Sequence, residues 1–437
     1  MNIDDIINSI DSNNLDIAFG RVVNISAVTL SAVGLDVAVG DIVRIESAQK
    51  LYTVLGMVTV LKDGLFVIVP FSFIDGFKIN DKVFLQRDGL TVKCGNGLLG
   101  RVVNALGDPI DDLGKIKDLD TNAPINKESM SPLDRGIIDK KFATGVKAID
   151  SMLTCGKGQK VGIFAGSGVG KSTLMGMIVQ GCEATIKVIA LVGERGREIP
   201  EFIHYNLNNN LENTVIVTAT SDESPLMRKY AAFTAMTIAE YFRDKGYDVL
   251  LMMDSVTRFA MAQREIGLST GEPPVSRGYP PSVFALLPQL MERAGNSKKG
   301  SITAFFTVLV DGDDLNDPIA DQSRSILDGH IVLTRDLTEQ GFYPPINILK
   351  SASRVIDKVV TKEHYNDFLK LKRVLSLIKE NEVLIRVGAY KKGMDLELDS
   401  AIAKKEKARE FLTQGTLEKY SFDEIVANLR KVLIWYH

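Results

Sequence analysis

The hydrophobic pattern changes twice along the 437-residue chain and divides it into three parts. From about residue 17 to 92, short β-branched runs are separated by turn residues at intervals of roughly ten residues, which is typical of a small β-barrel or sandwich. Gly34, Gly40 and the Asp-Gly pairs at 63–64, 75–76 and 88–89 supply the breaks. We therefore predict a β-barrel domain over residues 20–92.

The middle of the chain alternates fully apolar runs with longer stretches of helical periodicity. The apolar runs lie at 161–165, 188–192, 215–217, 249–253, 303–309 and 331–333, and 226–244 has helical spacing. This alternation predicts an α/β fold with a parallel sheet covered by helices on both faces. We assign residues 93–355 to this domain and expect a loop in its first part, up to about Arg135.

The two ends of the chain differ from this pattern. After residue 355 only helical periodicity remains, for example over 368–378 and 401–412, so we predict a helical C-terminal domain over 356–437. Residues 1–19 mix Asp, Asn and Ser with isoleucines at 3, 6, 7 and 10. That spacing fits either a flexible tail or a short amphipathic helix that binds a partner.

Composition limits where the protein works and what it binds. The chain has 52 basic and 55 acidic side chains, so no overall basic excess favours nucleic acid or an anionic membrane. Three scattered cysteines are too few for a disulfide framework. The N-terminus is acidic, and no apolar run approaches the ~18 residues that a membrane span needs. We expect a cytoplasmic protein.

The strongest motif is a glycine-rich turn between a predicted strand and a predicted helix. Such a turn points its backbone N–H groups at phosphate, a lysine reaches the β- and γ-phosphates, and the following hydroxyl binds Mg²⁺. Ala165 stands at the usual first glycine position. The predicted nucleotide-binding residues of this P-loop are Gly166, Ser167, Gly168, Val169, Gly170, Lys171, Ser172 and Thr173, with Ser172 also a metal ligand.

Two acidic residues follow other buried strands of the same sheet. Asp254 ends the run 249–253, where ligands bind in open α/β sheets, so we predict that it positions Mg²⁺. Glu194 lies in Gly-Glu-Arg-Gly-Arg-Glu after the run 188–192. A carboxylate beside a P-loop can activate water for attack on the γ-phosphate, and Glu194 is our candidate for this role.

Together these motifs resemble the catalytic subunits of rotary-type ATPases, whose core is a RecA-like P-loop fold between a β-barrel and a helical domain. The resemblance rests on residues 165–173, 193–198, 254–260, 280–295 and 344–354. Within that superfamily, residues 136–158, 281–288 and 388–395 are most similar to the ATPases of type III protein export, and to the flagellum-specific branch in particular.

The resemblance implies roles for three more residues. Arg354 matches the arginine finger that reaches the γ-phosphate of a neighbouring subunit. Tyr343 matches the aromatic residue that stacks on adenine, and Phe411 is expected in the same pocket. The chain has Gly415-Thr416 where a synthase β subunit has Pro-Phe, which argues against a synthase subunit. Lys171, Glu194 and Arg354 in one chain imply a homohexamer with a complete site at each interface.

The resemblance also implies a function and partners. The expected function is Mg²⁺-dependent ATP hydrolysis that energises flagellar protein export, at the cytoplasmic face of the inner membrane. The implied partners are a stator-like regulator at the N-terminal segment, a stalk-like coiled coil, chaperone–substrate complexes and the membrane export gate.

Three other functions remain as alternatives. A virulence (injectisome) secretion ATPase would share all of these motifs. A ring-shaped RNA translocase would interleave aromatic and basic residues on its β domain, and no basic cluster accompanies the few aromatic residues there. A non-catalytic ring subunit would lack Glu194 or a normal P-loop, whereas both are present.

Overall fold

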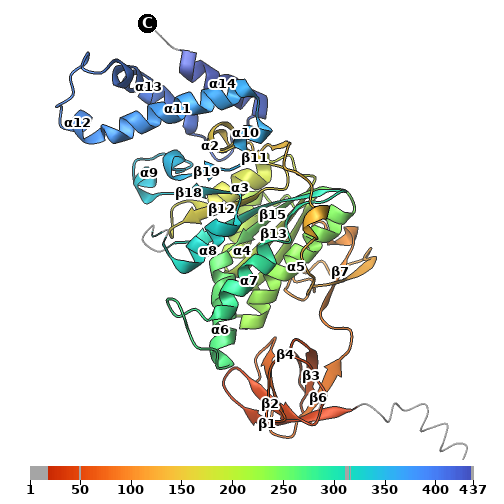
Figure 1. The fold of residues 1–437 in the computed structure, drawn as a ribbon. Helices are drawn as coiled ribbons and strands as arrows, with labels where there is room; N and C mark the ends of the chain where they lie inside the picture. Colours follow the sequence, from red (N-terminus) through yellow and green to blue (C-terminus); the bar gives the residue numbers. More distant parts are fainter. Residues whose placement is uncertain (1–17, 49–50, 311–313, 315, 435–437) are drawn as a thin grey trace, which may run out of the picture.

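The computed structural model describes residues 18–48, 51–310, 314 and 316–434, and its three parts follow one another along the molecule (Figure 1). A β-barrel lies at one end, an α/β domain in the middle and a group of helices at the other end. Among the described residues, no helix is long and apolar enough to cross a bilayer. The choice between a flexible tail and a short helix at the N-terminus concerns residues that lie, up to residue 17, outside the described ones.

The N-terminal part is a closed barrel, as predicted. Its strands follow the order β1-β2-β5-β4-β3-β6 around the barrel. Every second residue of a strand points inward, and Val22, Ile45, Val58 and Ile68 are fully buried there. The strands are β1 (Phe19–Ile25), β2 (Leu30–Val33), β3 (Ile42–Glu46), β4 (Thr53–Lys62), β5 (Leu65–Pro70) and β6 (Lys82–Gln86).

The link between barrel and α/β domain contains short strands where we expected a loop. Strand β7 (Thr91–Cys94) pairs with β9 (Thr121–Pro124), and β8 (Val102–Val103) extends the edge of the main sheet beside β14. The loop expectation was wrong for these segments, because strands of two to four residues are too short to show a hydrophobic period. Two short 3₁₀ helices, η1 (Asn96–Leu98) and η2 (Pro132–Asp134), also lie in this link.

The central sheet is parallel along most of its width, as predicted. Its order is β19-β18-β12-β17-β15-β13-β14-β8, and only β19 and the short β16 run antiparallel to their neighbours. Its strands are β12 (Lys160–Ala165), β13 (Ile186–Glu194), β14 (Thr214–Thr220), β15 (Asp248–Asp254), β16 (Gly295–Asn296), β17 (Ser301–Leu309), β18 (Gly329–Val332) and β19 (Ala352–Ser353). A separate pair, β10 (Lys141–Phe142) and β11 (Cys155–Gly156), lies beside it.

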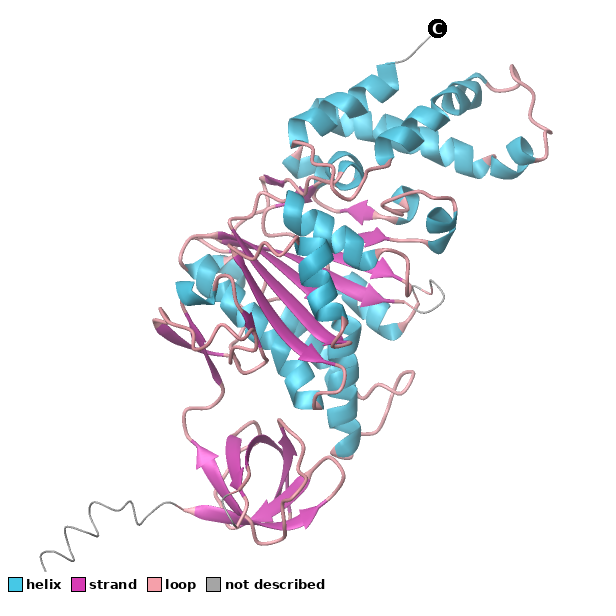
Figure 2. Cartoon of the chain, turned by 180° about the vertical axis from the view of Figure 1, so that it is seen from behind, coloured by secondary structure: helices cyan, strands magenta, loops and turns pink. Residues whose placement is uncertain are grey.

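Helices cover both faces of this sheet, which explains the continuous apolar runs of its strands (Figures 1 and 2). In β13, Val188, Ala190 and Val192 join the core under α5 and α6, whereas Ile189 and Leu191 join the core on the α3 side. The helices of this domain are α2 (Lys147–Met152), α3 (Lys171–Gly181), α4 (Glu198–Glu201), the π-helix η3 (Phe202–Asn206), α5 (Pro225–Asp244), α6 (Val256–Ser269), α7 (Pro281–Met291), α8 (Pro318–Ile326), α9 (Arg335–Glu339) and the 3₁₀ helix η5 (Ile348–Lys350).

The C-terminal part is helical, as predicted, and its core is continuous with the α3 side of the central domain. Phe368, Leu371 and Phe411 belong to the same buried cluster as Ile149 of α2. Its helices are α10 (Ile356–Val359), α11 (Lys362–Glu380), α12 (Glu382–Arg386), α13 (Leu396–Leu412) and α14 (Phe422–Ile434). The exact domain limits at residues 19, 92 and 355 remain predictions.

Candidate active site

The glycine-rich turn connects β12 to α3 at the carboxyl edge of the sheet. Gly168 and Gly170 have φ angles of 77° and 91°, a left-handed conformation that other residues rarely adopt, so glycine is needed at both positions. Gly170 is also the N-cap of α3, so Lys171 and Ser172 open a helix whose N-terminus favours an anion. The Arg335 guanidinium donates a hydrogen bond of 3.2 Å to the carbonyl of Ser167 and holds the loop from outside.

Three predicted site residues meet beside this loop. Nζ of Lys171 lies 2.6 Å from Oδ1 of Asp254 and 3.8 Å from Oε1 of Glu194. The Thr307 hydroxyl donates a second hydrogen bond, of 2.7 Å, to the same Asp254 oxygen. Glu194 and Asp254 end adjacent parallel strands, β13 and β15, and this sheet order brings them together although they are far apart in sequence.

Glu194 has the properties of a general base. Burial, and then the nearby Asp254 carboxylate, raise the pKa of Glu194 to about 7, against smaller opposite effects of Lys171 and Arg258. Its Oε1 is buried and, within the described residues, accepts no hydrogen bond. A carboxylate with a pKa near neutrality and a free acceptor oxygen can receive a proton from a water molecule.

A cavity of about 250 Å³ opens beside these residues, and Ser172, Glu194, Asp254, Arg197 and Asn206 are among those that line it. Ser172 and Asp254 offer a hydroxyl and a carboxylate oxygen, the ligand types that Mg²⁺ prefers. No group of three or more His, Cys, Asp or Glu in the described part of the chain could hold a metal. Mg²⁺ usually takes one or two protein ligands together with phosphate oxygens.

The two residues predicted for the adenine pocket differ in their exposure to solvent. Tyr343 is 43% exposed, and its loop lies next to the P-loop, since a Cβ on Gly170 would be 3.9 Å from Pro345. Phe411 is only 7% exposed and packs in the helical core. A hydrogen bond from the backbone N–H of Gln414 to the Tyr343 carbonyl joins the two regions. Tyr343 thus has the free ring surface that stacking on a base needs, whereas the buried Phe411 offers little ring surface to a ligand.

Arg354 lies at the opposite end of the sheet from the P-loop of its own chain. Ser353 pairs with Gly329, which pairs with Val161 near the start of β12, and the Arg354 N–H donates to the carbonyl of Asp328. The P-loop follows the other end of β12, about 13 Å further along. The Arg354 side chain is exposed, and its guanidinium donates a weak bond of 3.4 Å to the Arg324 carbonyl. It is therefore free to act on another chain.

Sequence reasoning missed three side chains that support the site. Thr307 fixes Asp254, Arg335 holds the P-loop, and Arg258 contributes positive charge toward Glu194. Thr307 was detectable as a polar residue inside an apolar strand, and Arg258 as a basic residue one turn after Asp254. Nothing local marks Arg335, because its contact depends on how β18 and α9 place it.

Comparison with known families gives two matches. Residues 145–353 match the ATP synthase alpha/beta family, nucleotide-binding domain. Residues 360–431 match the T3SS EscN ATPase C-terminal domain. The second match agrees with the sequence resemblance to type III export ATPases.

Individual proteins show the same similarity over nearly the whole chain. The chain is 57% identical over 416 residues to a flagellum-specific ATP synthase of Helicobacter pylori (strain J99 / ATCC 700824), covering 95% of each. It is also similar to the assembled ATPase EscN from the type III secretion system of enteropathogenic E. coli, with 45% identity, a TM-score of 0.90 and coverage of 95% of this chain and 100% of EscN. The structure of EscN in complex with its central stalk EscO matches with a TM-score of 0.88, 44% identity and the same coverage.

Proposed function

The chain belongs to the family of flagellum-specific and type III secretion ATPases, and from this premise we propose that it hydrolyses ATP to energise flagellar protein export. The observation that carries the proposal is the meeting of Lys171, Asp254 and Glu194 beside the P-loop, where the two carboxylates line one cavity. These residues supply a phosphate-binding cation, a metal ligand and a base, the parts that phosphoryl transfer to water requires.

Each side chain has a separate task in this reaction. The backbone N–H groups of residues 166–170 and the N-terminus of α3 hold the phosphates, while Lys171 neutralises the β- and γ-phosphates. Glu194 orients a water molecule and receives its proton on Oε1, which accepts no hydrogen bond from the described residues. Arg335 keeps the loop in place through the Ser167 carbonyl. Tyr343 offers its exposed ring to the adenine base, with Phe411 behind it.

Ser172 and Asp254 would hold Mg²⁺, which when bound offsets the negative charge of the phosphates. Asp254 is prepared for this task because Thr307 and Lys171 fix one of its oxygens. Because the Asp254 carboxylate is already oriented, little rearrangement is needed when the substrate binds.

The active unit is a homohexamer in which Arg354 of one subunit completes the site of the next. The position of Arg354 at the far end of β12 supports this division, because a single chain cannot bring it to its own P-loop. The similar ATPase EscN is described as assembled, and as forming a complex with its central stalk EscO. We extend both features to this chain, with a stalk-like coiled coil at its C-terminal helices.

The remaining partners follow from the same proposal. A stator-like regulator binds the N-terminal segment, and chaperone–substrate complexes are received and passed to the membrane export gate. The protein acts at the cytoplasmic face of the inner membrane at the flagellar base. No nucleic acid takes part, since the net charge of −3 offers no general attraction to a phosphate backbone.

An injectisome ATPase is the second candidate, because the two EscN structures, which come from a type III secretion system, are 45 and 44% identical to this chain. Deleting the gene distinguishes the two. Loss of filaments and motility, restored by the intact gene and not by a Lys171→Ala copy, supports flagellar export. Normal motility with lost effector secretion would move the protein to the injectisome class. RNA-stimulated hydrolysis would revive the translocase alternative.

A further inference from the structure

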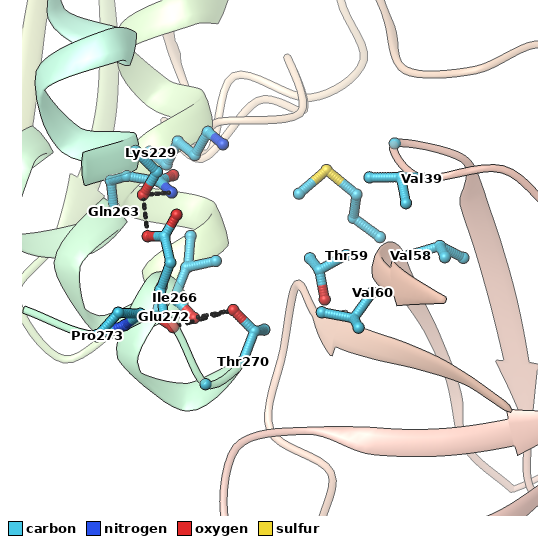
Figure 3. A pocket seen from close by; sticks show the side chains of 15 residues that line it. Val39, Val58, Thr59, Val60, Lys229, Gln263, Ile266, Thr270, Glu272 and Pro273 are labelled. Carbon is cyan, nitrogen blue, oxygen red and sulfur yellow. Dashed lines mark hydrogen bonds between the residues drawn. The ribbon is translucent and has the colours of Figure 1, made fainter. Parts of the chain in front are cut away.

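A second cavity, of about 480 Å³, lies between the barrel and the central domain, away from the P-loop (Figure 3). Its volume is in the range of ligand pockets, about 300 to 1,000 Å³. The barrel side is largely apolar and includes Val39, Met57 and Val60. The opposite side belongs to α5, α6, the segment after α6 and the start of α7, and it carries most of the polar side chains that line the cavity. A ligand with one apolar and one polar face would match both walls.

The polar wall contains a hydrogen-bond chain that leaves one acceptor unused. The Ser282 hydroxyl has a single proton, which it donates to Oε2 of Glu272 at 2.5 Å. Ser282 must then accept from Nε2 of Gln263, at 3.0 Å, and this fixes the orientation of the Gln263 amide. Gln263 is 8% exposed, and its Oε1 has no partner among the described residues. A buried carbonyl oxygen of this kind favours a ligand that brings an N–H donor.

The same wall contains a lysine without a counter-ion. Lys229 extends from α5 at the edge of the cavity, and no carboxylate of the described residues lies within ion-pair distance of it. Its Nζ lies 5.7 Å from the ring centroid of Tyr230. Burial lowers the pKa of Lys229 to about 8, with no acidic neighbour to oppose it. An acidic group entering the cavity would stabilise this ammonium.

The apolar barrel wall, the unused acceptor of Gln263 and the ammonium of Lys229 together fit an acidic, amphipathic peptide. Its carboxylate would pair with Lys229, a backbone N–H would reach Oε1 of Gln263, and aliphatic side chains would cover the valines and methionine of the barrel wall. We propose that, while no regulator holds it, the segment Ile3-Asp-Asp-Ile-Ile7 of this chain docks in the cavity and joins the barrel to the central domain.

Two properties of the chain favour its own segment over a separate protein. Residues 1–17 contain Asp at 4, 5, 11 and 16 and no Lys or Arg, with Ile at 3, 6 and 7. Residues 8–18 are eleven residues, which can span at most about 36 Å, slightly more than the length of the ten-residue strand β4. A short tether gives an effective concentration in the millimolar range, so weak contacts suffice for docking.

Disulfide trapping in the full-length chain tests the proposal. Ile6→Cys is combined with Thr59→Cys in the cavity wall, or with Ile79→Cys as a control. Ile79 is 61% exposed. It lies beside β1, the strand that follows the segment, since the neighbouring Asn80 N–H donates a hydrogen bond to the Val22 carbonyl of β1. If the segment had no binding site in the cavity, Ile6→Cys would form a disulfide with Ile79→Cys at least as fast as with Thr59→Cys. The chain with Ile6→Cys alone controls for reaction with Cys182.

We expect an intrachain disulfide with Thr59→Cys that forms at least about fivefold faster than with Ile79→Cys. Lys229→Glu should lower the rate of this disulfide about fivefold, and Lys229→Met should give an intermediate rate. Adding Asp4→Lys and Asp5→Lys to the Lys229→Glu variant should restore the rate, because the charges of the two sides are then exchanged. Equal rates for the two cysteine pairs, or no response to Lys229→Glu, would overturn the proposal. A disulfide found only between chains would assign the cavity to the segment of a second copy.

Discussion

The Lys171 ammonium lies 2.6 Å from the Asp254 carboxylate, so the lysine of the P-loop and the acid that we propose as a metal ligand form one ion pair across the sheet edge. Both side chains are largely buried, with 13% and 5% of their surface exposed. Thr307 holds the same Asp254 oxygen. The P-loop and strand β15 are thus connected before any phosphate chemistry begins.

Replacing Asp254 with Asn should weaken the dependence of hydrolysis on Mg²⁺. The amide keeps the shape but loses the charge that attracts the cation, and it leaves Lys171 without its partner. We expect the Mg²⁺ concentration for half-maximal phosphate release to rise about tenfold or more. Asp248→Asn, at the other end of β15, is the matched control. Equal Mg²⁺ titrations of the Asp254 variant and the unchanged chain would remove Asp254 from the metal site.

Glu194→Gln should abolish turnover and leave nucleotide binding intact. The amide cannot accept the proton of the attacking water, so phosphate release should fall by about 10² to 10⁴-fold. Binding of a fluorescent ATP analogue should stay within about twofold, because the P-loop is unchanged. Glu198→Gln, in the wall of the same cavity, should keep most of the activity. Activity near the normal level in Glu194→Gln would exclude this residue as the base.

The rate should rise with pH through neutrality. Because the pKa of Glu194 is raised to about 7, the carboxylate needed as base is the minor form below pH 7 and dominates above it. We expect kcat/KM to fall about tenfold per pH unit below 7 and to level off above it. Nucleotide affinity, measured in parallel, checks that binding does not cause the change. A flat kcat/KM profile between pH 6 and 8 would contradict this assignment.

Mixing two inactive variants should restore activity. Lys171→Ala removes the phosphate cation and Arg354→Ala removes the arginine finger, so each homogeneous protein should be inactive. In a mixed ring, an interface is complete when an Arg354→Ala chain supplies the P-loop and a Lys171→Ala chain supplies the arginine. An equal mixture should therefore recover up to about one quarter of the normal rate. No recovery in rings shown to be mixed would mean that the arginine does not act between subunits.

Asp111→Asn should destabilise the link between barrel and central domain. Asp111 accepts two hydrogen bonds of 2.7 Å from Arg101 and one from the Val102 N–H, and these hold its pKa at about 2, below its ordinary 3.8. This stabilisation is present above pH 3.8 and is lost as pH falls toward 2. The free energy of unfolding of the variant should be about 2 kcal/mol lower at pH 7, which urea denaturation would show as a lower midpoint. Near pH 2 the variant and the unchanged chain should have similar stability. Exposed Asp112→Asn should leave the midpoint unchanged.

The sequence was most informative where a local pattern produces the structure. Strands buried on both faces must be continuously apolar, so β12, β13 and β15 could be predicted. The P-loop could be predicted because its glycines, lysine and serine act within one turn. The three-part architecture followed from the changes in hydrophobic period.

The parts that escaped prediction depend on distant segments of the chain. The hydrogen-bond chain of Gln263, Ser282 and Glu272 joins α6, α7 and the segment between them, and each residue alone is unremarkable in sequence. The raised pKa of Glu194 arises from burial and from Asp254, which only the sheet order brings close. Short strands such as β8 are too short to show a hydrophobic period, and their pairing with a distant strand such as β14 is not visible in sequence.

Helix α6 begins two residues after Asp254 and ends at Ser269, beside the cavity that faces the barrel. Its fourteen residues form a rod of about 21 Å. An α-helix of this length is stiff along its axis, so an axial displacement at its first turn would also displace its last turn. A reporter dye placed on the barrel opposite Thr270 would therefore test whether nucleotide turnover beside Asp254 is felt at the cavity between the two domains.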